Sequence, residues 1–164
     1  MSKQVNVFVG TSKGGFIFTS DEKRKDWQMS DIQFKSWNMM HMQLDPRDNR
    51  LHAAVSHNVY GPTTHYSDDF GITWTQAKQS PVIPRPSQSG RPPSTVEEAF
   101  RSEAGDSVKD KPEKMIKVWH IKPGRGNEAN VLYAGAQPAS LFISKDRGET
   151  WEINEGLYDH PHRG

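Results

Sequence analysis

Hydrophobic and polar residues alternate in short runs along most of the chain, as in "LHAAVS" (51–56) and "VLYAGA" (131–136). Gly, Pro, Asp and Asn, which favour turns, separate these runs. Alternation with a period of two predicts half-exposed β-strands, because successive side chains of a strand point to opposite faces. We therefore predict an all-β fold. Its strands are expected at 5–10, 15–19, 26–30, 37–44, 51–56, 63–67, 73–77, 115–122, 131–136, 140–144 and 150–154.

One octapeptide occurs twice, as "SDDFGITW" at 67–74 and as "SKDRGETW" at 144–151. In a tight turn an Asp carboxylate and a Ser hydroxyl can accept hydrogen bonds from backbone N–H groups, and a Gly allows positive φ. We expect a structural turn rather than a calcium loop, because each copy offers one or two carboxylates where Ca²⁺ takes about 6 to 8 oxygens. The residues with this structural role are Ser67, Asp69, Gly71, Thr73 and Trp74 in the first copy and Ser144, Asp146, Gly148, Thr150 and Trp151 in the second.

Longer repeats surround the octapeptides. Segment 37–55 aligns with 117–136 when His41 is placed on His120, and a partial third copy without the octapeptide Gly lies at 7–27. Each full copy contains four predicted strands and the front copy three, which is typical of the blades of a β-propeller. The predicted parts of this single domain are blade one at 5–30, blade two at 37–78, an inserted loop at 80–112, blade three at 115–154 and a linker to a missing blade at 155–164.

Three blades are too few for a closed ring, since propellers have about 4 to 8 blades. We therefore expect a partial β-propeller in an open ring, as a fragment of a larger propeller. On this interpretation, the missing C-terminal blades of the same protein are among its partners.

The inserted loop at 80–112 is rich in Pro, Ser, Gly and charged residues. A loop of this length inside a compact domain is usually functional or disordered. Its few apolar residues favour disorder, with at most a short helix over 95–103.

The composition excludes several classes of protein. The 21 Lys and Arg balance 20 Asp and Glu, so the net charge of +1 creates no strong field for nucleic acid or an anionic membrane. Without Cys there are no disulfides, thiolate metal sites or Cys nucleophiles. The N-terminus lacks the apolar region of a signal peptide, and no segment approaches the ~20 apolar residues of a membrane span. We expect a cytoplasmic protein with no cofactor and no nucleic-acid or membrane partner.

The histidines are the one group of residues whose positions suggest a binding or catalytic site. His41 and His120 occupy equivalent positions on the expected innermost strands, so both could approach the central channel. Imidazoles that converge from successive blades could bind a transition metal or polarise a substrate oxygen. We favour equivalent packing and assign no metal, because the pair lacks the carboxylate or thiolate company of a metal site. The candidate axial site consists of His41, His120, Asp159, His160, His162 and Arg163.

The pattern S-x-D-x-G-x-T-W resembles the Asp-box, or BNR repeat, of sialidases, sortilin-type receptors and photosystem assembly factors. The similarity extends to "HMQLDPRDNRLHAAV" and "EGLYDHPHRG". These segments resemble the N-terminal part of a bacterial group of BNR-repeat propellers described as glycosyl hydrolase or exo-alpha-sialidase-like. The resemblance implies that each box lies on the turn between the third and fourth strands of a blade, away from any active site.

Three classes of function are compatible with these features. We favour a binding platform for a small molecule, a glycan or a partner protein. The resemblance implies a glycoside hydrolase of the exo-sialidase type as an alternative, which would need three convergent Arg residues, a Tyr nucleophile with a Glu beside it and an Asp acid; the usual Arg-Ile-Pro segment is not found. A metal-dependent lyase or lactonase built on the histidines is the third class. The sequence identifies no catalytic residue, and a glycosidase is the enzyme that it would favour.

Overall fold

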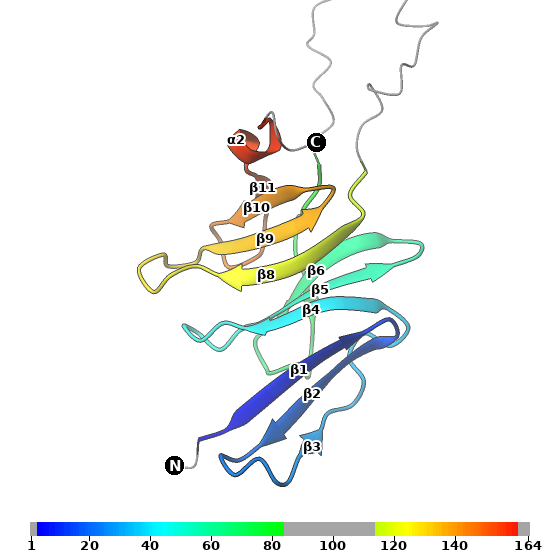
Figure 1. Ribbon diagram of the computed structural model, residues 1–164, viewed down its shortest axis with the longest axis vertical. Helices are drawn as coiled ribbons and strands as arrows, with labels where there is room; N and C mark the ends of the chain where they lie inside the picture. The colour runs from blue at the N-terminus through cyan, green and yellow to red at the C-terminus, as the bar shows by residue number, and fades with distance from the viewer. Residues whose placement is uncertain (1–2, 84–113, 161–164) are drawn as a thin grey trace, which may run out of the picture. The chain divides into compact units, whose positions relative to one another are not determined.

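The computed structural model describes residues 3–83 and 114–160. The eleven strands of this part of the chain are β1 (Val5–Thr11), β2 (Gly14–Ser20), β3 (Gln28–Met29), β4 (Asn38–Leu44), β5 (Leu51–His57), β6 (Gly61–Ser67), β7 (Thr75–Gln76), β8 (Lys117–Pro123), β9 (Leu132–Gln137), β10 (Ser140–Ser144) and β11 (Glu152–Ile153). They form three antiparallel sheets in the orders β1-β2-β3, β4-β5-β6-β7 and β11-β10-β9-β8 (Figure 1). The expected all-β fold of three- and four-stranded sheets is confirmed.

The first strands of the three sheets are neighbours, since β4 contacts both β1 and β8. Each sheet then continues outward in chain order, as the blades of a propeller do. With β4 between β1 and β8, the three sheets of the described residues form a partial propeller that is not closed. No described helix is long and apolar enough to cross a membrane.

All of these strands belong to one compact unit, Met1–Val82 with Met115–Gly164. A second unit, Ile83–Lys114, covers most of the expected inserted loop. The helix expected over 95–103 lies outside the described residues.

Side chains of the first two sheets form one apolar cluster of the core. The first sheet approaches the second closely at Gly15, where an added Cβ would lie 2.2 Å from the Met39 sulfur, so a larger residue would push the sheets apart. The buried members of this cluster are Ile17, Met39, Met42, Leu51, Ala53 and Val55.

The outer strands β3, β7 and β11 have two residues each, so they are shorter than the sequence pattern predicted. Each of them pairs with one neighbour only, and short edge strands are a common way to limit pairing with other chains. Residues 155–164 were expected to be a linker, but Glu155–Tyr158 form a one-turn helix, α2. The Asn154 side chain caps α2 by accepting a hydrogen bond from the Leu157 N–H (2.9 Å).

The first octapeptide turn joins β6 to β7 through hydrogen bonds of its own side chains. The buried Ser67 hydroxyl donates to Asp69 Oδ1 (2.7 Å) and accepts from the Gly71 N–H (2.8 Å). The Asp69 carboxylate also accepts from the Thr73 N–H (2.8 Å) and hydroxyl (2.5 Å). These bonds, led by the Thr73 hydroxyl, lower the pKa of Asp69 to about 2. Gly71 has φ +89°, the left-handed conformation for which Gly is suited.

The second octapeptide turn joins β10 to β11 with the same bonds. Ser144 donates to Asp146 Oδ1 (2.8 Å) and accepts from the Gly148 N–H (2.8 Å). Asp146 accepts from the Thr150 N–H (2.9 Å) and hydroxyl (2.6 Å). Gly148 also has φ +89°. Equivalent bonds differ by no more than about 0.1 Å between the turns, so the repeated residues encode one geometry.

The tryptophans that end the two octapeptides differ in burial and in the hydrogen bonding of the indole N–H. Trp151 is 2% exposed, and its indole N–H has no hydrogen-bond partner among the described residues. Trp74 is half-buried and its indole N–H donates to the Gln33 side chain (2.8 Å). The first Trp is thus tied to the segment that connects the first and second sheets.

Candidate functional site

The two ends of the sheets carry different structures. The octapeptide turns, the β4–β5 turn (45–50) and the β8–β9 turn (124–131) lie at one end, which we call the octapeptide end. The β5–β6 turn (58–60) and the start of β4 lie at the opposite end, which we call the aromatic end.

His41 and His120 lie together, with ring centroids 3.8 Å apart and ring planes inclined by 34°. Equivalent β-bulges precede them, between Met39 and His41 and between Val118 and His120. A bulge changes the direction of the side chains that follow it, and these bulges bring both rings to the contact between β4 and β8. The sequence alignment identified the pair, but not the bulges.

His41 is held as a neutral ring. Its Nδ1 accepts a hydrogen bond from the Ile121 N–H (3.2 Å), so its ring proton is on Nε2. Burial lowers the pKa of His41 to about 4, and the nearby charges of His120 and Lys122 add to this effect. Only one nitrogen of His41 is therefore available to a ligand.

The other members of the expected axial site follow the third sheet. Asp159 ends α2, donating its N–H to the Glu155 carbonyl (2.8 Å), and His160 comes next in the chain. Helix α2 contacts β10, which is two strands away from β8. His162 and Arg163 lie outside the described residues. Within residues 3–83 and 114–160 no group of three or more His, Asp or Glu is placed to hold a metal ion.

Arginines gather at the octapeptide end, and three of them, Arg47, Arg50 and Arg147, are paired with carboxylates. Arg50 is 7% exposed and forms two bonds of 2.7 Å with the Asp68 carboxylate. Arg147, from the next sheet, pairs with Asp48 (2.6 Å). The Arg50 guanidinium also donates to the Arg147 carbonyl (3.3 Å). The Arg147–Asp48 ion pair and the hydrogen bond from Arg50 to the Arg147 carbonyl join the second and third sheets.

Arg47 makes a second connection between these sheets. It forms a bidentate pair with the buried Asp45 (2.6 Å at the shortest). The same guanidinium donates to the carbonyls of Glu128 (2.6 Å) and Val131 (2.9 Å) in the β8–β9 turn. The guanidinium of Arg47 thus donates its hydrogen bonds to groups of the protein.

Two tyrosines are paired with glutamates. The Tyr66 hydroxyl donates to Glu149 (2.7 Å), and the Tyr133 hydroxyl donates to Glu128 (2.8 Å). Each hydrogen bond raises the pKa of its tyrosine. A carboxylate beside a tyrosine hydroxyl can act as its general base, so these are the two Tyr–Glu pairs of the described residues that the exo-sialidase alternative could use.

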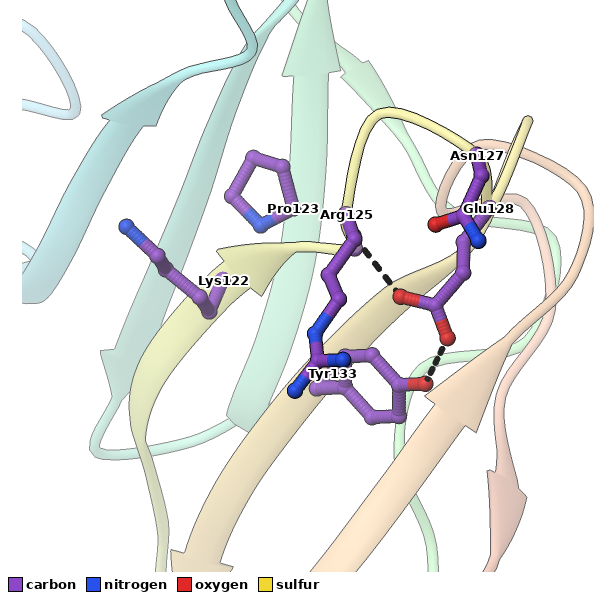
Figure 2. A pocket seen from close by; sticks show the side chains of 7 residues that line it. Lys122, Pro123, Arg125, Asn127, Glu128 and Tyr133 are labelled. Atoms are coloured by element: carbon purple, nitrogen blue, oxygen red, sulfur yellow. Dashed lines mark hydrogen bonds between the residues drawn. The ribbon is translucent and has the colours of Figure 1, made fainter.

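A hollow of about 490 Å³ lies beside the β8–β9 turn, and Tyr133 lines it. Figure 2 shows the Glu128 carboxylate between the Arg125 backbone and the Tyr133 hydroxyl; the Arg125 N–H donates to it at 2.7 Å. The one carboxylate of the hollow therefore fixes the turn. The other lining residues are Lys122, Pro123, Gly124 and Asn127.

A cluster of rings that the sequence analysis did not identify runs from Trp74 toward the aromatic end. Phe34 lies at its centre, with ring centroids 4.8 Å from His65, 5.0 Å from Trp74 and 6.2 Å from Trp37. Phe34, Trp37 and Trp74 pack against the apolar core of the first two sheets. The cluster is thus anchored in the interior.

Beside this anchor, the rings of Trp37, His57 and Tyr60 contact one another. The His57 ring lies 4.9 Å from the Trp37 ring and 5.1 Å from the Tyr60 ring. The planes of Trp37 and Tyr60 are within 16° of parallel. Tyr60 is 72% exposed and its neighbour Val59 is 78% exposed. We call Trp37, His57 and Tyr60 the aromatic stack.

The segment before β4 has a strained backbone that hydrogen bonds hold in place. Phe34 (φ 49°) and Ser36 (φ 71°) both have positive φ, which is uncommon for residues other than Gly. Gln33 exchanges two backbone hydrogen bonds with Gly15 (2.8 and 2.9 Å), and Ser36 donates its N–H to the Lys13 carbonyl (3.0 Å). Such strain persists where surrounding contacts fix the backbone, often at functional sites.

No protein-family model matches this chain, and no curated protein matches it. Among solved structures it is similar to one described as "YCF48 bound to D1 peptide", with a TM-score of 0.43 and 9% sequence identity. The match covers 93% of this chain and 42% of that chain. The chain therefore spans less than half the length of that structure's chain.

Proposed function

We propose that this chain is a binding module in which the aromatic end of the second sheet contacts the ligand. The observation that carries the proposal is the aromatic stack, three rings in mutual contact, of which Trp37 packs against the core and Tyr60 is exposed. Large aromatic rings with a polar tip are enriched at binding surfaces, because they offer contact area at little conformational cost.

The polar atoms of the stack support this role. The His57 Nδ1 accepts a hydrogen bond from the Val59 N–H (3.2 Å), which leaves the ring proton on Nε2. Among the described residues, neither that Nε2 nor the Trp37 indole N–H nor the Tyr60 hydroxyl has a hydrogen-bond partner. The stack therefore offers apolar ring faces together with three polar groups that a ligand can use.

A metal-dependent lyase or lactonase is supported less well. The pairing of His41 with His120 fits it, but the bond from the Ile121 N–H occupies one nitrogen of His41. A metal site would also need a third ligand from residues that are not near the pair in the described part of the chain.

A glycoside hydrolase of the exo-sialidase type is also supported less well. Binding a sugar carboxylate would require free guanidinium groups. Arg47, Arg50 and Arg147 are instead engaged by Asp45, Asp68 and Asp48. A binding role needs none of these ion pairs to open.

Calorimetric titration of the chain with a panel of oligosaccharides and neutral peptides tests the proposal. We expect at least one of them to bind, and Tyr60→Ala to weaken that affinity at least tenfold while His120→Ala leaves it unchanged. Weakening by His120→Ala alone would contradict the proposal, as would hydrolysis of a fluorogenic sialoside that survives Tyr60→Ala.

A further inference from the structure

We infer that the ligand of the aromatic stack is a proline-rich peptide in the polyproline II conformation. The inference rests on the proposed function, since it names the ligand of the same surface. It follows from the hydrogen-bonding groups, the charge and the open space around the stack.

The free polar groups of the stack are donors. The Trp37 indole N–H and the His57 Nε2–H can only donate, and the Tyr60 hydroxyl can donate as well as accept. Their best complement is a ligand with acceptors and few donors of its own. A proline-rich peptide has this property, because each proline has a carbonyl oxygen and no N–H.

The ring faces suit the same ligand. Proline-rich segments dock on aromatic surfaces, and their preformed conformation loses little entropy on binding. Trp37 and Tyr60 present nearly parallel faces (16°) with centroids 6.1 Å apart. Prolyl rings can pack against the Tyr60 ring, which is 72% exposed, while the carbonyls of the peptide reach the donors.

Charge and space agree with a neutral peptide. The Trp37 and Tyr60 side chains carry no formal charge near neutral pH, so they offer a charged ligand no ionic partner. Beside Tyr60, an added Cβ on Gly61 would meet no atom within 4 Å. The exposed side of the turn is therefore open to a ligand.

A pyranose is the other neutral ligand that stacks on aromatic rings. Its hydroxyl groups donate as well as accept, so it would need acceptors at the site. The Tyr60 hydroxyl is the one side-chain acceptor that the stack offers. The balance of donors and acceptors therefore favours the peptide.

Calorimetric titration of the full chain with an end-blocked oligoproline peptide, and separately with a cello-oligosaccharide, tests the inference. We expect the peptide to bind and Tyr60→Ala to weaken it at least tenfold. Tyr60→Phe, which removes the hydroxyl alone, should weaken it about two- to twelvefold, the effect of one neutral hydrogen bond. Ile72→Ala is the matched control, because Ile72 is 83% exposed at the octapeptide end; it should change nothing.

The outcomes separate the inference from the function on which it rests. Binding of the cello-oligosaccharide but not of oligoproline, with loss in Tyr60→Ala, would overturn the peptide and leave the proposed function standing. Oligoproline binding that is equal in wild type and Tyr60→Ala would overturn the peptide inference at this surface. If neither probe binds, the peptide inference also fails, and the wider panel described above decides the proposed function. Circular dichroism should show the same β-signal for all variants, since Tyr60 and Ile72 are exposed.

Discussion

Replacing Asp146 by Ala tests whether the octapeptide turns stabilise the fold. The Asp146 carboxylate accepts three hydrogen bonds, from the Ser144 hydroxyl, the Thr150 N–H and the Thr150 hydroxyl. Ser144 is completely buried, whereas the bonds from Thr150 are exposed. Water can replace the carboxylate at Thr150 but has poor access to Ser144.

The expected loss of stability is therefore close to that of one buried donor. An unpaired buried polar group costs about 1–3 kcal/mol, and the rehydrated Thr150 groups add little. Lys145→Ala is a suitable control, because Lys145 is the preceding residue and makes only a surface ion pair with Glu152 (3.3 Å); we expect it to change the free energy of unfolding by less than about 0.5 kcal/mol.

Urea unfolding followed by tryptophan fluorescence gives both free energies. The result that would refute this reasoning is an Asp146→Ala variant as stable as Lys145→Ala. Loss of ligand binding by Asp146→Ala at unchanged stability would also refute it, since the turn would then act on function directly.

Two further changes test the buried side of the second octapeptide turn. Burial lowers the pKa of His52 to about 4, so its neutral form is favoured in the folded state; stability should be complete above about pH 6.5 and fall as the pH drops to about 4, because the unfolded chain takes up the proton first. In urea titrations across this range, His52→Gln should flatten the fall by up to about 1.4 kcal/mol per pH unit, and an unchanged slope would argue against this assignment. Gly148→Ala should destabilise the fold more than Gly61→Ala: both residues have positive φ, but only the Gly148 Cβ would crowd other atoms, at 3.2 Å from His52 Nδ1. Equal melting temperatures for these two variants would contradict this expectation and show that the turn moves to make room for the added Cβ.

The fold could be predicted well from the sequence because its signals are local. Alternation of apolar and polar residues located the strands, and the repeated octapeptides located the turns, since Asp69 and Asp146 bond to groups within four residues of themselves. The alignment placed His41 and His120 at equivalent positions of two strands, and because those strands are neighbours, the two rings lie 3.8 Å apart.

The aromatic stack could not be predicted in the same way. Trp37 precedes β4, His57 ends β5 and Tyr60 lies in the next turn, so no fixed spacing links them. Their meeting depends on the register of β5 with β6 and on the strained segment before β4. One signal was present, because Val59 and Tyr60 are large apolar residues in a turn, where polar residues are expected.

The ion pairs between arginines and aspartates could not be predicted from the sequence either. The sequence shows how many Arg and Asp residues there are, but the pairing of Arg147 with Asp48 depends on the packing of the third sheet against the second. Tertiary packing, rather than local sequence, decided that these guanidinium groups serve the fold.

The most direct test of the central claim is the set of indole N–H signals in a ¹⁵N-labelled sample titrated with oligoproline. The chain has five tryptophans, and two of them distinguish the candidate sites: Trp37 belongs to the aromatic stack, and Trp119 precedes His120 in β8 and is 47% exposed. We predict that the Trp37 signal shifts as the peptide binds and that the Trp119 signal stays in place. A shift of the Trp119 signal with Trp37 unmoved would contradict the account and place the ligand at the histidine pair.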